Sequence, residues 1–303
     1  MMHFEGVTRL LLLLALIFEV RLRAEETVPI ASVPEVRRLS PERAAEGLPV
    51  RLKGVVTWHP EGAFYALVVD DGKEGIYCDV RMAMERGLLP ERYNVDVLAK
   101  TVNEGVEVEI EGVTDRGGYA PIVLPTAIRA IGSADLPAPK TVPFLNLFSG
   151  AMDCQRVVVE GVVRAAHREK STRAVTLDVG TFYGSFQFRL LEPNDLAAAT
   201  LVNAKVRVAG CLLPLFNART EMIGVTVQTN RLSDLMVLEA GPEDPFAAQE
   251  IVSTGLRPFS AAGVELHRQK VRGVVTAQTS WELFDASAGH EGHPGVLRNR
   301  RPF

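Results

Sequence analysis

The sequence predicts an all-β protein made of two tandem five-stranded barrels and the beginning of a third, with short helices between strands. A short glycine-centred phrase occurs three times, in residues 50–57, 158–164 and 271–276, around Gly54, Gly161 and Gly273. Around each glycine, apolar residues recur with the spacing of a half-buried strand. Neighbouring copies are about 110 residues apart, which is the size of a small domain and exceeds a solenoid unit of about 20–50 residues. Each copy is therefore expected to begin a separate domain.

The N-terminal segment predicts export. Arg9 precedes an apolar run over residues 10–18, and Ala24 could stand just before a cleavage point. The run is too short for the roughly 20 residues that span a bilayer, and it matches the core of a signal peptide. We expect a signal peptide at residues 1–24 and a periplasmic or extracellular protein. An uncleaved short anchor or a buried N-terminal helix is the alternative.

Residues 25–47 are expected to be a lead-in with one short helix. Ser40 is a typical N-cap, Pro41 suits the first helical position, and Gly47 suits the helix end. Leu39, just before the cap, is expected to hold this turn against the first domain.

Residues 48–132 form the first predicted barrel. Gly54 interrupts its first strand, and a glycine inside a strand often marks a sharp bend at a barrel corner. A bent first strand, five strands and a helix between the third and fourth are typical of the OB type of Greek-key barrel. Strands are expected at residues 50–56, 64–69, 75–80, 106–113 and 121–131, with a helix or loop at residues 82–89.

Opposite charges predict which strands of this barrel are neighbours. Arg51 and Lys53 share one face of the first strand, while Glu107 and Glu109 share one face of the fourth. A cross-strand pair of opposite charges contributes about 0.2–1 kcal/mol. We therefore expect Arg51 and Lys53 to meet Glu107 and Glu109.

The second predicted barrel, at residues 154–238, follows the same order. Residues 133–153 and 239–267 are rich in proline and are expected to be stiff, extended linkers. Residues 268–303 are expected to be a truncated third repeat with a disordered tail, because far fewer residues remain than a complete repeat uses. Strands of the second barrel are expected at residues 156–164, 174–179, 184–190, 206–210 and 222–228, with a short helix at residues 193–199.

Four segments resemble a known family. Residues 39–57, 69–77, 117–123 and 136–139 are similar to the exported N-terminal repeat region of large bacterial membrane-bound sensor histidine kinases. The similarity extends over roughly residues 35–276. It implies a periplasmic sensory or interaction module of a two-component system. No kinase motif occurs in this sequence, so the resemblance implies no phosphotransfer by this polypeptide.

The cysteines leave two alternatives open. Cys154 begins the first strand of the second repeat, and Cys211 ends its fourth strand, so antiparallel pairing would bring the two together. They would then form either a disulfide or, as we favour, two buried free thiols.

The sequence offers no set of residues typical of a catalytic, metal or cofactor site. It has no phosphate-binding loop, zinc motif or nucleophile elbow. Asp70, Asp71 and Asp79 could gather a calcium ion, but Asp-Asp-Gly first predicts a hairpin turn. His290 and His293 lie in a glycine-rich tail and are expected to be solvated. We therefore expect neither an enzyme nor a cofactor.

Five residues are candidates for ligand binding. Trp58, Tyr65 and Tyr77, together with Phe64, fall on the first three strands, the face on which OB folds stack bases or sugars. Asn217 and Arg219 fall in the loop between strands four and five of the second repeat, a common OB binding loop. Core packing of the aromatic residues and solvation of the polar residues are the alternatives.

Three classes of function are compatible with these features. The one we favour is a non-catalytic exported module that binds a small ligand or a protein. A nucleic-acid-binding OB protein is the alternative, but the formal net charge of −4 and the acidic first repeat argue against it. An exported enzyme would need convergent titratable residues, which the sequence does not offer.

Overall fold

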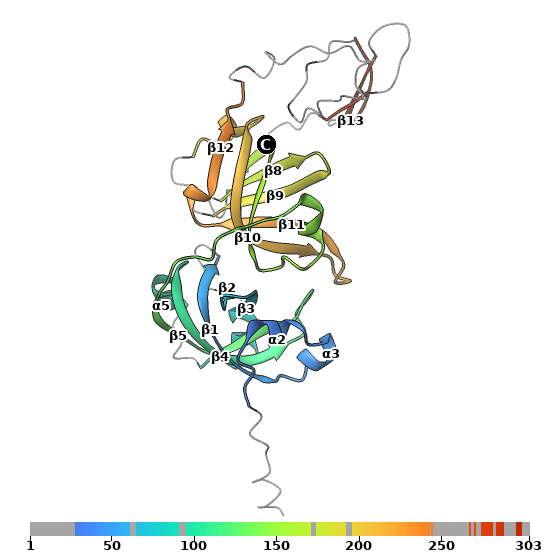
Figure 1. The fold of residues 1–303 in the computed structure, drawn as a ribbon. Coiled ribbons are helices and arrows are strands. Elements are labelled where there is room, and N and C mark those ends of the chain that lie inside the picture. Colours follow the sequence, from blue (N-terminus) through green and yellow to red (C-terminus); the bar gives the residue numbers. More distant parts are fainter. Residues whose placement is uncertain are drawn as a thin grey trace, which may run out of the picture.

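The computed structural model describes residues 28–60, 65–90, 95–170, 174–191 and 196–242, the single residues 244, 267 and 270, and three strands near the C-terminus. The described chain is mostly β-sheet, and it forms two β units stacked end to end (Figure 1). No helix among the described residues is long and apolar enough to cross a membrane. The predicted signal peptide and Gly273 lie outside the described residues.

The first unit is the predicted closed five-stranded barrel. Its strands pair in the ring order β1-β2-β3-β5-β4. Leu52, Leu67, Ile76, Ile110 and Leu124 fill its interior and are fully buried. The barrel elements are β1 (Pro49–Trp58), β2 (Ala66–Asp70), β3 (Gly75–Asp79), α4 (Val80–Glu85), α5 (Val95–Thr101), β4 (Val106–Asp115) and β5 (Ile122–Ser133).

The lead-in packs on this barrel through two helices, α2 (Val33–Arg37) and α3 (Pro41–Ala44). The helix expected after Ser40 is confirmed as α3, because the Ser40 hydroxyl accepts a hydrogen bond from Arg43 N. Helix α2 was not expected, although Val33 and Val36 are fully buried in the barrel core.

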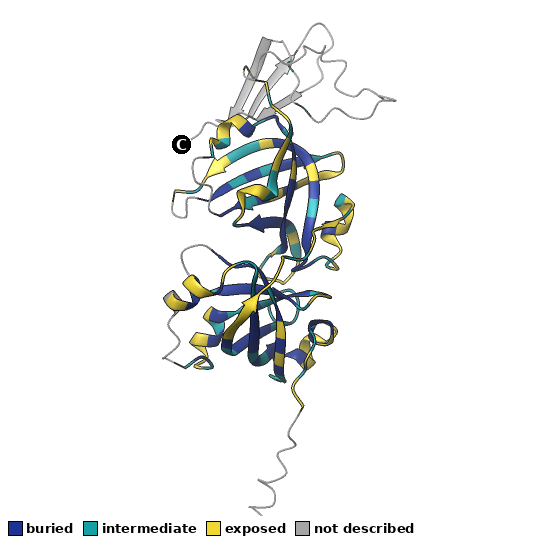
Figure 2. Cartoon of the chain, turned by 60° about the vertical axis from the view of Figure 1, so that its left-hand side comes forward, coloured by how far each residue is buried: buried dark blue, intermediate teal, exposed yellow. Residues whose placement is uncertain are grey.

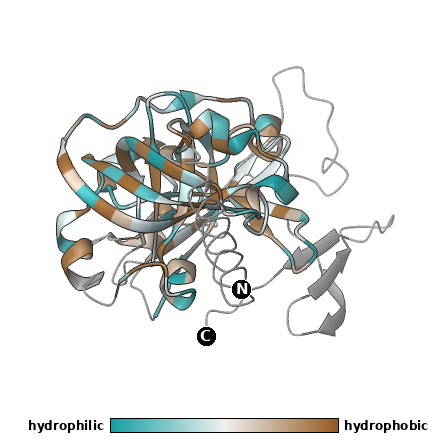
Figure 3. Ribbon diagram, turned by 90° about the horizontal axis from the view of Figure 1, so that it is seen from below, coloured by the Kyte–Doolittle hydropathy of each residue, from teal (hydrophilic) through white to brown (hydrophobic). Residues whose placement is uncertain are grey.

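The second unit is one sheet in which the strand pairings also form a ring. Strand β10 pairs with both β11 and β7, and β9 pairs in parallel with β11. Polar and apolar residues alternate along many strands, and most of the buried residues lie in the interior of each unit (Figures 2 and 3). The elements are β6 (Lys140–Thr141), η1 (Phe144–Phe148), β7 (Arg156–Arg168), β8 (Val175–Thr181), β9 (Gly184–Leu190), η2 (Ala198–Leu201), β10 (Lys205–Phe216), β11 (Met222–Thr229), η3 (Leu232–Asp234) and β12 (Leu235–Glu239).

The repeated glycines occupy the same place in the two units. Gly54 pairs with Val108 of β4, and Gly161 pairs with Val206 of β10. A methyl group on Gly54 would lie 2.3 Å from the Asp70 carbonyl oxygen, and one on Gly161 would lie 2.6 Å from that of Gly180. At both positions the neighbouring strand approaches too closely for a side chain, so glycine is required.

The predicted charge pairing is correct in its strands and partly wrong in its register. Strands β1 and β4 pair antiparallel, with Lys53 opposite Glu109 as expected. Arg51, however, lies opposite Glu111, and Glu107 lies opposite Val55. Arg51 Nη2 lies 3.0 Å from Glu109 Oε1. A shift of two residues keeps every side chain on its face, so alternation alone does not fix this register.

Four other segments differ from expectation. The second half of the predicted linker at residues 133–153 packs on the second unit, where Leu147 of η1 is 1% exposed. Helix α5 and strand β12 were not expected. The C-terminal strands β13 (Val274–Ser280), β14 (Leu283–Ser287) and β15 (Gly295–Arg298) form a three-stranded antiparallel sheet. Strand β13 begins within the expected third repeat, whereas β14 and β15 stand where a disordered tail was expected, because short antiparallel strands can pair locally through tight turns.

Candidate functional site

The two units meet at an apolar seam. Trp58, Ala66 and Val68 of the barrel pack with buried residues of the second unit. In Figure 2, buried residues lie where the two units meet, as well as inside each unit. The second unit contributes Cys154, Ala174, Leu191, Cys211 and Leu213.

Backbone atoms of the two units also come close together at this seam. A methyl group on Gly75 of β3 would lie 1.9 Å from the Cys154 carbonyl oxygen, so only glycine fits there. Cys154 has a φ of 61°, a conformation that residues other than glycine rarely adopt. A methyl group on Gly118 would lie 2.5 Å from the Phe216 ring.

An ion pair joins the units at one edge of the seam. Arg37 Nη1, at the end of α2, lies 3.0 Å from Asp153 Oδ2, and both side chains are largely buried. The same nitrogen donates to the Gly75 carbonyl at 3.3 Å. Burial lowers the pKa of Arg37, but the Asp153 carboxylate has the opposite effect and the net pKa is raised. Arg37 therefore remains charged and holds the second unit against the barrel.

A second polar contact joins the units through Asn230, just after β11. Its side-chain amide nitrogen donates to the His59 carbonyl oxygen at 3.1 Å, and its backbone N–H donates to Glu104 Oε1 at 3.2 Å. Burial raises the pKa of Glu104 to about 7, against the effect of the Asn230 hydrogen bond, and nearby Asp234 raises it further. Glu104 therefore changes its charge near neutral pH while it contacts the other unit.

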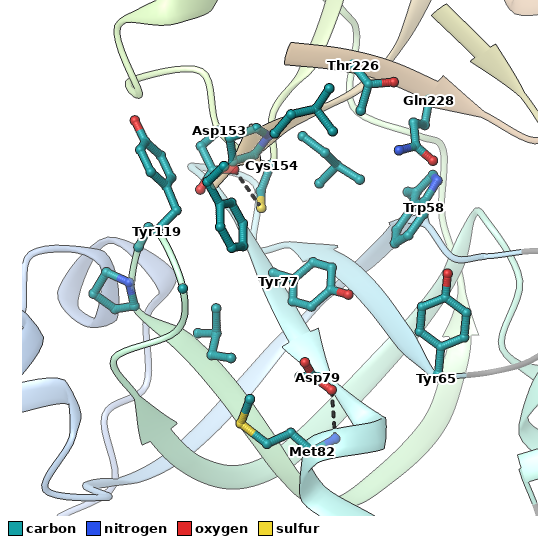
Figure 4. A pocket seen from close by; sticks show the side chains of 18 of the residues that line it. Trp58, Tyr65, Tyr77, Asp79, Met82, Tyr119, Asp153, Cys154, Thr226 and Gln228 are labelled. Atoms are coloured by element: carbon teal, nitrogen blue, oxygen red, sulfur yellow. Dashed lines mark hydrogen bonds between the residues drawn. The ribbon is translucent and has the colours of Figure 1, made fainter. Parts of the chain in front are cut away.

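A cavity of about 460 Å³ opens within the seam (Figure 4). The barrel side is formed by β1, the start of β2, β3, α4 and the β4–β5 loop, and the other side by the segment before β7 and by β9, β10 and β11. This volume falls in the range of about 300–1,000 Å³ that is typical of small-molecule sites. The residues that line the cavity include Trp58, Tyr65, Tyr77, Asp79, Tyr119, Ala120, Asp153, Arg189, Thr226 and Gln228.

The barrel wall of this cavity is the face that OB folds use for binding. That face is formed by the second and third strands and by the loops after the first and fourth strands. Here Tyr65 directly precedes β2, Tyr77 lies on β3, and Tyr119 lies in the β4–β5 loop. The second unit packs over this face, so the cavity lies between the two units.

The charged groups in the cavity wall already have partners. Asp79 Oδ1 accepts a hydrogen bond from Met82 N at 2.8 Å and caps α4. Asp153 is paired with Arg37. Arg189 Nη2 lies 2.6 Å from Glu169 Oε2. Burial raises the pKa of the Tyr77 hydroxyl, so this group is neutral as well.

Two polar atoms of the wall lack a partner. Trp58 is 3% exposed and Gln228 is 9% exposed. Among the described residues, neither Trp58 Nε1 nor Gln228 Oε1 has a hydrogen-bond partner. An unsatisfied buried donor or acceptor costs about 1–3 kcal/mol. Figure 4 places Gln228 and Trp58 in the same part of the cavity.

The structure brings together three of the five residues predicted to bind a ligand. Trp58, Tyr65 and Tyr77 line one cavity. Asn217 and Arg219 do not line it: Asn217 Oδ1 accepts hydrogen bonds from the backbone N–H groups of Arg219 and Glu221, at 2.9 and 3.1 Å, and so stabilises the β10–β11 turn. Phe64 lies outside the described residues.

Gln228, Thr226 and Tyr119 were not predicted from the sequence as site residues. Gln228 and Thr226 belong to a strand that was expected only to close the second repeat. The glycine pair next to Tyr119 was the one available signal, since it allows a tight loop to approach the Phe216 ring.

Cys154 and Cys211 are both buried free thiols in the seam, as favoured from the sequence, and no disulfide joins them. Their strands pair as expected, with Cys211 opposite Arg156 and Cys154 N donating to Leu212 O at 2.8 Å. Burial raises the pKa of each thiol.

The aspartates considered for calcium serve the backbone. Asp70 Oδ1 accepts from Gly72 N at 2.8 Å, and Asp71 Oδ1 accepts from Lys73 N and Glu74 N, as the hairpin turn requires. His290 and His293 lie outside the described residues.

No protein-family model matches the chain, and no curated protein matches its sequence. Among solved structures, a murine DNA-binding protein bound with double-stranded DNA matches 65% of this chain and 98% of its own, with 14% identity and a TM-score of 0.31. The p204 HINb domain matches 63% of this chain and 97% of its own, with 13% identity and a TM-score of 0.27.

An aspartyl-tRNA synthetase from Entamoeba histolytica matches 35% of this chain at 12% identity and a TM-score of 0.27. The match spans only 23% of the synthetase. TM-scores this low support no conclusion about function.

Proposed function

We propose that this protein is an exported, non-catalytic module of two tandem OB-type barrels and the start of a third, which binds a small ligand in the cavity between the first two. The resemblance to the sensory regions of membrane-bound histidine kinases suggests a role in sensing, or in presenting a bound ligand to a partner.

The matching registers of the two units support the tandem arrangement. In each unit the glycine of the first strand pairs with a valine of the fourth strand, and the glycine four residues further along the fourth strand pairs back with the first: Gly112 with Val50, and Gly210 with Val157. The ring of pairings also has the same order in both units. Two copies of one barrel explain these coincidences.

The observation that carries the ligand-binding proposal is the aromatic cavity on the OB binding face. Its walls come from both units, so a bound molecule would contact the barrel and the second unit together. Such a ligand stabilises the arrangement that it binds by about 2.7 kcal/mol when present at 100 times its Kd. Binding would thereby fix the relative position of the two units, which is how a sensory module can report a ligand.

Nucleic-acid binding has less support. The face that would stack bases is covered by the second unit, and cationic side chains nearby are paired: Arg189 with Glu169, and Arg156 with Asp234 at 2.9 Å. An oligonucleotide would need a basic groove and would bind less tightly as salt rises.

Native mass spectrometry tests the proposal. The full chain is expressed with export, purified from the periplasm or medium, and weighed for a bound small molecule. Ala120→Trp places a large side chain at the cavity wall, whereas Ala197→Trp places one at an exposed site outside it. We expect a co-purified small molecule that Ala120→Trp removes and Ala197→Trp retains. Salt-sensitive oligonucleotide binding that is equal in both variants would favour the alternative, and the absence of any molecule sensitive to Ala120→Trp would contradict the proposal.

A further inference from the structure

We propose that the cavity selects an uncharged, planar ring compound that presents a hydrogen-bond acceptor next to a donor, as a lactam does. This inference rests on the proposed function of the cavity as a ligand site, and it adds the chemical class of the ligand.

The rings of the wall favour a flat ligand. Trp58 and Tyr77 stack with ring centroids 6.4 Å apart and an interplanar angle of 29°. The Arg81 guanidinium lies 4.5 Å from the centroid of the Tyr65 ring and fixes that ring in place. Figure 4 shows Trp58, Tyr65 and Tyr77 grouped around one part of the cavity. Rigid aromatic surfaces of this kind bind planar rings by stacking or edge contacts, at about 0.5–1.5 kcal/mol beyond the area buried.

The charges of the wall disfavour an anionic ligand. The Arg189 guanidinium is paired with Glu169 and the Asp153 carboxylate with Arg37, so an anion would find no unpaired cation in the wall and would meet the carboxylates of Asp79 and Asp153. A buried ion without a counter-ion carries a desolvation penalty that no contact offsets. Neutral hydrogen-bonding groups remain, namely the hydroxyls of Tyr65, Tyr77 and Thr226 and the amide of Gln228.

The two unpartnered atoms specify the polar edge of the ligand. Trp58 Nε1 offers a donor from the barrel side of the cavity, and Gln228 Oε1 offers an acceptor from the side of the second unit. A ligand edge on which a carbonyl stands next to an N–H could accept from Trp58 Nε1 and donate to Gln228 Oε1. That edge would satisfy both groups at once, whereas a hydrocarbon ring would leave both unsatisfied.

Three bicyclic probes of similar size test this inference by calorimetry: 2-quinolone, naphthalene and quinoline-4-carboxylate. We expect 2-quinolone to bind, naphthalene to bind about tenfold more weakly, which is 1.4 kcal/mol, and the carboxylate about 100-fold more weakly. In the Trp281→Phe variant Trp58 is the only tryptophan left, and we expect 2-quinolone to shift its indole N–H resonance.

One variant and its control test whether Gln228 makes the polar contact with the ligand. Gln228→Leu is expected to abolish the preference for 2-quinolone over naphthalene. Gln155→Leu is the matched control, because Gln155 is also buried but does not line the cavity. It is expected to leave that preference unchanged.

The outcomes separate this inference from the proposed function. Carboxylate binding as tight as quinolone binding, and removed by Ala120→Trp, would overturn the ligand class and leave the ligand site standing. If none of the probes binds, the ligand class is wrong. If, in addition, no co-purified molecule is sensitive to Ala120→Trp, the proposed function fails as well.

Discussion

Glu104→Gln is expected to remove a pH dependence of stability that originates at the seam. The pKa of Glu104 is raised from 4.5 to about 7, chiefly by burial. A carboxyl group whose pKa is higher in the folded state keeps its proton longer in that state than in the unfolded one. Its contribution therefore weakens folding as the pH rises from 4.5 to about 7, and is constant outside that interval.

The size of this effect follows from the shift. A difference of about 2.5 pKa units corresponds to about 3 kcal/mol, at about 1.4 kcal/mol per unit. Because Glu104 is only partly shielded from water, we expect about 1–3 kcal/mol. Glutamine resembles the protonated carboxyl group and keeps the oxygen that accepts from Asn230 N. The variant should match the wild type at pH 4.5 and exceed its stability by this amount at pH 7.5.

Urea unfolding of both proteins at pH values between 4.5 and 7.5 measures the difference. Asp135→Asn, in the exposed segment after β5, is the control for removing a carboxylate elsewhere and should leave the pH profile unchanged. A stability difference between Glu104→Gln and the wild type that is the same at every pH would refute the reasoning.

Two further changes test the seam and the strand registers. Gly75→Ala should destabilise the chain by about 1–3 kcal/mol, because its methyl group would meet the Cys154 carbonyl at 1.9 Å. Gly224→Ala, whose methyl group would lie 3.5 Å from its nearest neighbour, should change the urea midpoint far less, and equal losses would contradict the close contact. Reversing the charge of either Glu160 or Arg207 should lower the free energy of unfolding by up to about 1 kcal/mol. Reversing both charges should restore most of this loss, as a double-mutant cycle would measure. Additive losses would show that the pair does not interact.

The sequence predicted the elements whose physical cause is local. The strands around Gly54 and Gly161 follow from period-two alternation, and the glycines follow from the close approach of a neighbouring strand in each unit. The residue opposite Arg51 could not be predicted from the sequence, because the three glutamates at alternate positions of β4 allow two registers of β1 against β4. Helix α5 was missed because its sequence, Val-Asp-Val-Leu-Ala-Lys-Thr, contains β-branched residues that equally suit a strand.

The candidate site was predicted only on its barrel side. The aromatic side chains of that side share one face by alternation, so their common location could be expected. Gln228 and Thr226 enter the cavity only because the second unit packs over the barrel. That contact depends on Gly75, Arg37 and Asn230, whose partners lie far away in the chain. No local pattern encodes it.

The reversed charges at equivalent positions bear on how the two units avoid exchanging strands while the chain folds. Lys53 lies opposite Glu109 in the barrel, and at the same register position Glu160 lies opposite Arg207 in the second unit. If β1 paired with β10, Lys53 would face Arg207, and if β7 paired with β4, Glu160 would face Glu109. Both incorrect strand pairings would place like charges opposite each other, which is destabilising. The two units can thus fold next to each other, because the charges of each one disfavour pairing with the strands of the other.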